Sequence, residues 1–411
     1  MRYRIGLTTL ALIALLAVPS ATRASEANDI EDLLRTRAQA LNNSDRESFM
    51  ATLDPRNAEF VGAQERLFNS VIKLPISNFA LELFDDEPEL TREKDRKKYG
   101  GQVIVAPVKE RYVLNGYDER PAIRELILTF VKQGEQWRIV SDTDTEDLGE
   151  FTDRDLWEFG DVVTRTSAHF ILLLHPEEAS FAEELLASAE AALPAVDQVW
   201  KSEWPKKTPI LVPSTKAELE RLIEATFDVS NFVAFATSGL DREDADAWDV
   251  VGTRIILNRQ NFLRHNQQVR TRIMVHELVH VATRGATGPF LPAFVEEGLA
   301  ELSGTLATPI LDRKVKDRKF DRRLPEDWEF TAGEGADILN SYQESVSAFK
   351  YMKEEFGIEG VNRFYLALGQ VRLEPGTSEY RLGKAFQEAL GIAFNDFESQ
   401  WASAISGGPG G

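Results

Sequence analysis

The chain contains no cysteine in its 411 residues. This absence excludes a disulfide framework, a thiolate nucleophile and a zinc site with sulfur ligands. It also excludes a lipoprotein anchor, because no cysteine follows the apolar N-terminal stretch. Histidine is scarce as well, with five residues in the chain. Any metal ion in this protein must therefore be held by His, Asp and Glu side chains.

Positive charge is in short supply. The sequence has 47 Lys and Arg residues against 67 Asp and Glu residues, which gives a net charge of −20. An acidic surface of this kind repels the phosphates of nucleic acids and of anionic lipids. We therefore expect neither nucleic acid nor an anionic membrane as a partner, and the sequence predicts no particular oligomeric state.

Long apolar runs are missing beyond the N-terminus. Residues 5–18 are largely apolar, follow two arginines and precede a Thr-Arg-Ala site at 22–24, a pattern typical of a secretory signal peptide. The run is shorter than the ~20 residues of a membrane span, and an uncleaved anchor is the less favoured alternative. We predict a signal peptide at residues 1–24 and a secreted or extracytoplasmic protein with no stable membrane insertion after cleavage.

Residues 26–150 have the pattern of a small α+β domain. Helical periodicity over 29–53 precedes strand-like segments, which lie at 71–84, at 103–114 and, as a hairpin, at 123–140. This order resembles that of the cone-shaped nuclear-transport-factor and SnoaL-like fold, which implies a ligand pocket inside the cone. Because all histidines lie later in the chain, we expect no hydrolytic chemistry here and favour a structural or partner-binding module. The acidic stretch 142–155 is predicted to be a linker.

A second domain is predicted at residues 155–405. Strands and helices alternate in its first part, with strands at 170–174, 209–213, 231–236 and 253–258 and helices at 177–200 and 215–226. Beyond residue 267 the pattern is almost wholly helical. The acidic stretch 239–249 is predicted to be a solvated loop, with calcium binding as the less favoured alternative. The overall expectation is an α+β protein whose mixed sheet is followed by a helical C-terminal half.

The stretch RIMVHELVHVA at residues 272–282 holds two of the five histidines. On a helix, His276 and His280 project from the same face, about 5–6 Å apart at Cβ, so both imidazoles can bind one metal ion. Glu277 is rotated from them by about 100° and can reach a water beside that ion. This H-E-x-x-H spacing predicts a zinc site with two histidine ligands and a glutamate general base. The alternative is a core helix with satisfied polar groups, which is less favoured because their burial without a metal is costly.

A second motif, PAFVEEGLAEL at residues 292–302, follows a turn rich in glycine and proline. Taken with HELVHV at 276–281, it resembles the HExxH zinc metallopeptidases of the peptidase MA-like family, of gluzincin type. The resemblance extends over about residues 160–400, although only these two motifs are specific. It implies a gluzincin-like metallopeptidase domain that is preceded by a non-catalytic N-terminal domain.

The resemblance also implies roles for the residues of the second motif. The glutamate directly before the glycine, Glu297, is expected to be the third zinc ligand, while Glu296 is expected to lie at the surface. Glu301 is expected to hydrogen-bond to His276 and so to fix its tautomer. Gly298 is expected to allow a close approach to the metal-binding helix, or to mark a helix crossing.

A donor for the oxyanion of the transition state is still needed. Metallopeptidases of this type take a Tyr or His from a downstream helix, which implies Tyr342 as the first choice and Tyr351 as the second. The resemblance also implies that the strand at 253–258 lies beside the cleft, where its free edge could pair with an extended peptide. The basic stretch 312–323 is interpreted as a solvated loop, with a clamp for an acidic substrate or for the N-terminal domain as the alternative. The other three histidines are interpreted as surface or structural residues.

These features together predict an exported zinc-dependent peptidase that acts on peptide or protein substrates. Two alternatives stay open. One is a zinc-bearing binding or scaffold protein whose N-terminal domain carries the function. The other is a metal-dependent amidase that cleaves cell-wall links or other non-peptide amide bonds.

Overall fold

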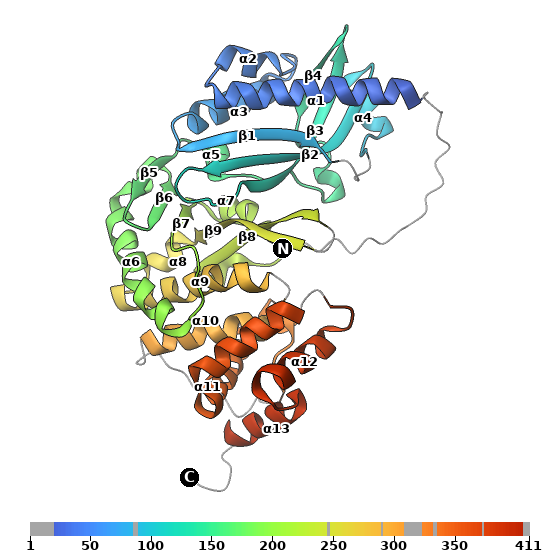
Figure 1. Cartoon of the computed structure of the whole chain (residues 1–411). Helices are drawn as coiled ribbons and strands as arrows, with labels where there is room; N and C mark the ends of the chain where they lie inside the picture. Colours follow the sequence, from blue (N-terminus) through green and yellow to red (C-terminus); the bar gives the residue numbers. More distant parts are fainter. Residues whose placement is uncertain are drawn as a thin grey trace. The chain divides into compact units, whose positions relative to one another are not determined.

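The computed structural model describes residues 20–84, 89–244, 247–288, 291–307, 323–331, 335–371 and 374–405. The chain divides into two compact units, the first comprising residues 1–164, 173–177 and 217–225 and the second residues 165–172, 178–216 and 226–411. The predicted α+β class is confirmed, because helices and strands occur in both units (Figure 1). Residues 1–19 of the predicted signal peptide and residues 312–322 of the predicted basic loop lie outside the described residues. Within the described ranges, no helix combines the length and the hydropathy that a membrane crossing requires.

The first unit begins with three helices, α1 (Ser20–Asn42), α2 (Arg46–Ala51) and α3 (Ala58–Val71). The predicted single helix over 29–53 is interrupted at Ser44, whose φ of 54° is incompatible with a continuing helix. Asp45 then caps α2 and accepts a hydrogen bond from the Ser48 N–H at 3.1 Å. The predicted strand at 71–84 is shorter than expected, because Val71 still belongs to α3 and β1 (Ile76–Leu83) begins after it.

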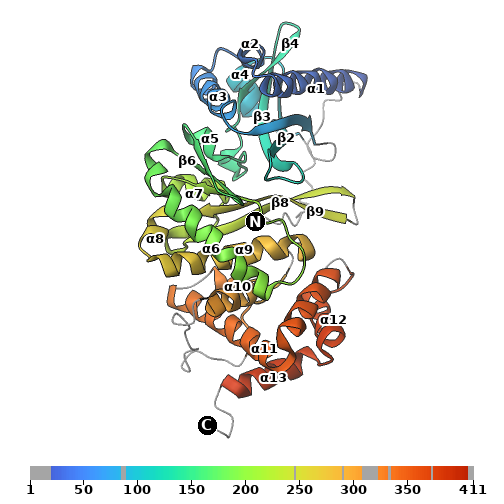
Figure 2. The same cartoon turned by 60° about the vertical axis from the view of Figure 1, so that its left-hand side comes forward.

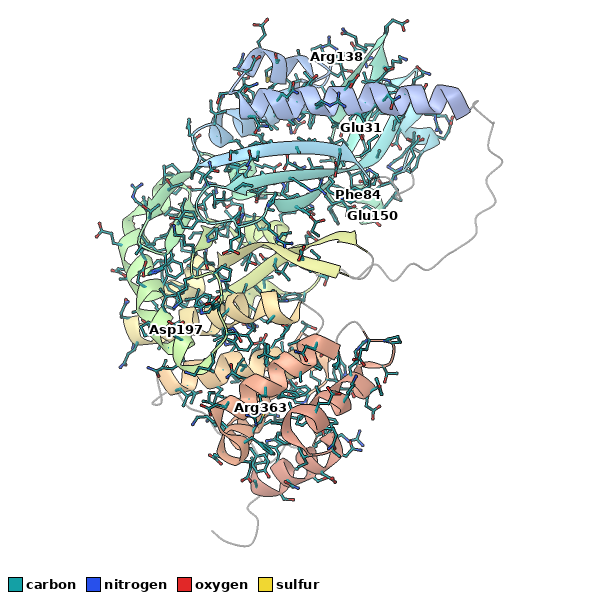
Figure 3. All side chains as sticks on the ribbon, in the orientation of Figure 1. Glu31, Phe84, Arg138, Glu150, Asp197 and Arg363 are labelled. Atoms are coloured by element: carbon teal, nitrogen blue, oxygen red, sulfur yellow. The ribbon has the colours of Figure 1, made fainter. Side chains whose placement is uncertain are left out.

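The first sheet is antiparallel and has the order β1-β2-β3-β4, with β2 (Val103–Leu114), β3 (Ala122–Gln133) and β4 (Gln136–Ser141). The predicted strand at 103–114 and the hairpin at 123–140 are thus confirmed. Side chains of α1 bind the backbone of β1. Asn42 bonds to both backbone groups of Phe79, and Glu31, labelled in Figure 3, accepts a hydrogen bond from the Leu83 N–H at 2.7 Å. These bonds satisfy strand-edge groups that need partners.

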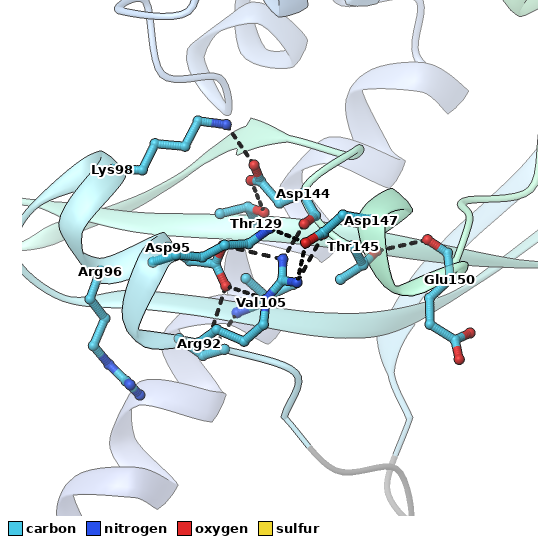
Figure 4. A network of polar contacts seen from close by, with 12 residues as sticks. Arg92, Asp95, Arg96, Lys98, Val105, Thr129, Asp144, Thr145, Asp147 and Glu150 are labelled. Carbon is cyan, nitrogen blue, oxygen red and sulfur yellow. Dashed lines mark hydrogen bonds and ion pairs between the residues drawn. The ribbon is translucent and has the colours of Figure 1, made fainter.

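The predicted linker at 142–155 is instead a built part of the first unit. Figure 4 shows how residues at α4 (Glu93–Tyr99) bind this segment. Arg92 donates to Asp147 at 2.9 Å, and Lys98 donates to Asp144 at 2.6 Å. The prediction of a linker is wrong, because these acids pair with basic side chains at α4 within the same unit.

The interior of the first unit holds an ionic cluster. Arg124 on β3 lies 3.1 Å from Glu110 and 2.8 Å from Glu158, and it also contacts Asp155. Glu158 belongs to the short helix α5 (Leu156–Phe159), whose Trp157 packs against an aromatic ring of β2. Charged and aromatic side chains therefore meet between the sheet and this helix.

The second sheet has the strand order β5-β6-β7-β9-β8. Its strands are β5 (Val163–Thr166), β6 (Phe170–Leu174), β7 (Thr208–Val212), β8 (Ala234–Asp244) and β9 (Ala247–Leu257). The prediction of a loop at 239–249 is wrong in most of that range, because the antiparallel strands β8 and β9 continue through it. The expected free edge at 253–258 is also corrected. β9 pairs with both β7 and β8, so β8 is the strand at this edge of the sheet.

η2 (Pro176–Phe181) and α6 (Ala182–Val199) connect β6 to β7, and α7 (Lys216–Leu222) and η3 (Val229–Asn231) connect β7 to β8. The short helix η1 (Glu146–Leu148) precedes this sheet in the chain, and α8 (Arg259–Leu263) follows β9. The predicted helix at 177–200 therefore begins as a 3₁₀ turn and becomes α-helical at Ala182.

Beyond residue 267 the described residues are mostly helical, as predicted. The helices are α9 (Gln267–Thr287), α10 (Ala293–Ala307), η6 (Asp327–Phe330), α11 (Gly335–Val371), α12 (Ser378–Leu390) and α13 (Phe394–Ile405), and α11 is kinked at Gly357. In both views α9 lies between the hairpin β8–β9 and helix α10, with α11 packed on α10 (Figures 1 and 2). This stacking places α9 in the middle of the second unit.

The expected role of Gly298 is resolved by its neighbours. A Cβ atom at this position would lie 2.3 Å from the Phe349 ring and 3.0 Å from the Ser345 carbonyl oxygen, both on α11. A carbon atom 2.3 Å from a non-bonded ring atom would clash with it. Gly298 therefore marks the crossing of α10 with α11 and does not serve a close approach to α9, the predicted metal-binding helix.

Candidate metal centre

Helix α9 carries two candidate ligands one turn apart. Asn266 starts the helix by accepting a hydrogen bond from the Val269 N–H at 3.1 Å. Buried apolar residues on either side of the motif draw the helix into the core, among them Val275, Leu278 and Val279. The rings of His276 and His280 are consequently largely buried, and their centroids are 4.9 Å apart.

Glu297 on α10 completes a triangle of ligand atoms. Its Oε2 lies 3.1 Å from His276 Nε2 and 3.7 Å from His280 Nε2, and the two Nε2 atoms are 3.2 Å apart. A tetrahedral zinc ion with bonds of about 2.0–2.1 Å requires ligand atoms about 3.3–3.4 Å apart. The three separations bracket that value. Among the described residues, this is the one group of three such side chains close enough to share an ion.

The triangle sets one carboxylate against two imidazoles. Glu297 Oε2 is buried and has no hydrogen-bond partner of acceptable geometry. Although burial opposes ionisation, the charges of His280 and His276 hold the pKa of Glu297 below its ordinary value. Burial likewise lowers the pKa of His276, but contacts with Glu297 and Glu301 outweigh it and raise that pKa well above its ordinary value. The site therefore favours positive charge, and its nitrogen and oxygen donors suit zinc.

Glu277 lies next to His276 in sequence but outside the triangle. Its side chain is buried, with 6% of the residue exposed, and the backbone N–H of Ala236 on β8 donates a hydrogen bond to it. Burial raises the pKa of Glu277, while the charges of His276 and His280 oppose that rise. The edge strand β8 thus supplies a backbone donor to the predicted general base.

Two further predicted residues surround His276. Glu301 Oε1 lies 3.2 Å from His276 Nδ1, on the side of the ring away from the triangle. The Tyr342 ring on α11 is centred 6.4 Å from the His276 ring and 5.3 Å from the Phe330 ring of η6. Burial, together with nearby carboxylates, raises the pKa of Tyr342 well above its ordinary value. Its phenol therefore stays protonated and remains a hydrogen-bond donor.

Tyr351, the second choice for the oxyanion donor, and Glu296 both have partners outside the triangle. The hydroxyl of Tyr351 donates to Gln400 on α13 at 3.2 Å. The prediction of Glu296 as a surface residue is wrong, because its side chain is 19% exposed and lies 3.6 Å from Arg284. Burial raises the pKa of Glu296. Of the remaining histidines, His265 is half-buried, His169 lies 2.8 Å from Glu190 and His175 lies 3.2 Å from Glu218.

Three contributors to the site are not among the residues predicted from the sequence. Arg272 on α9 binds Glu301, the Ala236 backbone binds Glu277, and Phe330 supports Tyr342. Arg272 could have been found, because it lies four residues before His276 and so shares its face of the helix. The other two come from distant segments and carry no local signal.

Comparison with known proteins adds no assignment. No protein-family model matches this chain, and no curated protein is significantly similar to it. The function proposed for the chain therefore rests on the site itself.

Proposed function

We propose that this protein is an exported zinc-dependent peptidase with His276, His280 and Glu297 as the metal ligands. The observation that carries the proposal is the triangle of ligand atoms, whose separations of 3.1, 3.2 and 3.7 Å suit a tetrahedral zinc ion. Three protein ligands leave the fourth position open, which is the mark of a catalytic rather than a structural zinc site. The apolar stretch at residues 5–18 supports export.

Each of the two units also supports a proposal about its fold. The two ligand-bearing helices beside a mixed sheet support a gluzincin-like metallopeptidase domain at residues 155–405. Three helices packed with a four-stranded antiparallel sheet support a cone-like fold for residues 26–150. The paired charges inside that unit favour a structural or partner-binding role for it over a ligand pocket.

When bound, zinc supplies the Lewis acidity that polarises a carbonyl group and makes water acidic near neutral pH. Glu277 accepts the proton of the attacking water and delivers it to the leaving amine. Burial raises the pKa of Glu277 toward the range where one carboxylate can do both. Tyr342, kept neutral by burial, donates a hydrogen bond to the oxyanion.

The site also suggests how a substrate lies. β8 is the edge strand of its sheet and contacts Glu277 through Ala236. An extended peptide can add to such an edge by backbone hydrogen bonds, which suits a peptide or protein substrate.

The test is a metal analysis and a peptide-library digest of the chain without residues 1–24. We expect one zinc per chain and cleavage of library peptides. The variant Glu277→Gln is nearly isosteric and should keep its zinc, while activity falls by ~10²–10⁴ because the general base is lost. Unchanged hydrolysis in this variant would sink the mechanism. A zinc-loaded protein that cleaves no peptide would favour an amidase for non-peptide bonds or a zinc-bearing scaffold.

A further inference from the structure

Arg272 lies one helical turn before His276 on α9 and reaches across to α10. Its Nη2 donates to Glu301 Oε2 at 2.5 Å, while the other oxygen of that carboxylate, Oε1, lies 3.2 Å from His276 Nδ1. One carboxylate thus bridges a guanidinium and an imidazole, with one oxygen for each. The three side chains are 15%, 23% and 16% exposed, so solvent screens this chain of contacts only in part.

The path of the Arg272 side chain depends on a glycine. A Cβ atom at position 304 of α10 would lie 3.1 Å from Arg272 Cγ and 3.4 Å from its Nε. Gly304 therefore leaves the space through which the arginine passes toward Glu301. The other terminal nitrogen of Arg272, Nη1, is buried and has no hydrogen-bond partner among the described residues. The guanidinium is thus committed to Glu301.

We infer that Arg272 is a positioning residue of the metal centre, which acts on His276 through Glu301. The inference rests on the proposed function, because it assumes a metal at His276 Nε2. A carboxylate that accepts from Nδ1–H leaves the Nε2 lone pair free for the metal and fixes the direction of the ring. Arg272 holds that carboxylate from its far oxygen, so the carboxylate cannot rotate away from the imidazole.

The competing explanation is that Arg272 merely fastens α9 to α10. A fastening role and a positioning role differ in what a substitution changes. If Arg272 only stabilises the packing of α9 on α10, its loss lowers the stability of the metal-free protein and does not change the affinity for zinc. Loss of a positioning residue weakens zinc binding and alters the ligand field, even where the metal-free protein unfolds at the same temperature.

The experiment measures the dissociation constant for zinc by chelator competition in the wild type, Arg272→Met and Arg272→Lys. Methionine keeps an aliphatic stem beside Gly304 but has no charge, and we expect zinc to bind about 10–100-fold more weakly. Lysine restores a charged donor without the planar fork, so it should recover part of the affinity. The visible spectrum of the cobalt-substituted protein should change in parallel. Arg284→Met is the matched control, since Arg284 lies on the same helix but faces Glu296 at 3.6 Å, and its zinc affinity should match the wild type.

The possible outcomes distinguish failure of the positioning role from failure of the proposed function. If the wild type binds zinc and Arg272→Met binds it equally well, Arg272 is only a fastener and the positioning role is overturned. A metal-free protein destabilised by Arg272→Met, with an unchanged zinc constant and cobalt spectrum, overturns it in the same way. A wild type that binds no zinc at all overturns the proposed function as well.

Discussion

Two buried clusters of acidic residues, one in each unit, differ in what balances their charge. In the first unit each carboxylate meets a guanidinium, with Glu110 at 3.1 Å and Glu158 at 2.8 Å from Arg124, and Asp142 at 2.7 Å from Arg154. The cluster in the second unit consists of Glu277, Glu297 and Glu301, and of these only Glu301 contacts a guanidinium. Glu297 faces two imidazoles, and Glu277 is bound by a backbone N–H.

The contrast teaches how to tell a structural cluster from a binding site. Arginine keeps its proton at any physiological pH, so acids paired with arginine are compensated within the fold itself. Imidazoles supply charge only when protonated, and their nitrogens can instead be metal ligands. The first cluster is therefore compensated without a ligand, whereas the second is the one proposed to bind a cation.

The largest expected effect tests the incomplete cluster directly. Replacing Glu297 with alanine removes one of the three proposed ligands, and we expect zinc content to fall from one per chain to almost none. Glu296→Ala is the matched control, because this neighbour is similarly buried but pairs with Arg284. Metal analysis after dialysis gives the answer. Zinc lost from the Glu296 variant and kept by the Glu297 variant would reverse the ligand assignment.

The next effect tests the complete cluster. Arg124→Met leaves Glu110, Asp155 and Glu158 without their shared guanidinium, and breaking a buried pair in this way costs about 3–5 kcal/mol. Urea unfolding of the first unit would measure the loss. Arg35→Met is the control, since Arg35 and Asp32 form an exposed pair, 62% and 70% exposed, whose loss costs below ~1 kcal/mol. Equal costs in the two variants would contradict a compensated interior.

The sequence predicts features that depend on contacts within one helix or hairpin, and it misses features that depend on contacts between distant segments. The spacing of His276, Glu277 and His280 is a property of one helix, and the alternation at 123–140 is a property of one hairpin, so the sequence alone predicts both. The strand at the sheet edge beside Glu277 is β8 and not the expected β9, because strand order depends on pairing across the whole sheet. The burial of Glu296 is missed for a similar reason, since its partner Arg284 lies on another helix.

A smaller expected effect tests the donor beside the incomplete cluster. Tyr342→Phe keeps the ring, and with it the packing between His276 and Phe330. We expect normal folding and zinc content, with turnover reduced by ~10²–10³ because one oxyanion donor is lost. KM should change little, since that bond forms mainly in the transition state. Tyr351→Phe serves as the control, because Tyr351 donates to Gln400. Turnover within about threefold of wild type in Tyr342→Phe would exclude this role.

The smallest expected effect concerns Asp147, an exposed acid of the first unit that pairs with Arg92 and Lys94. Hydrogen bonds from Lys94 and then Arg92 lower the pKa of Asp147 to about 2. Since the unfolded value is about 3.9, the folded state favours the ionised carboxylate, and the pairing stabilises the fold above that pH. The contribution is lost as the pH falls from about 4 to about 2. Asp147→Asn should therefore unfold at lower urea than the wild type at pH 7, and the gap should close over that window and shrink with added salt. A gap of constant size from about pH 7 to about pH 2 would show that Asp147 acts through packing and not through its charge.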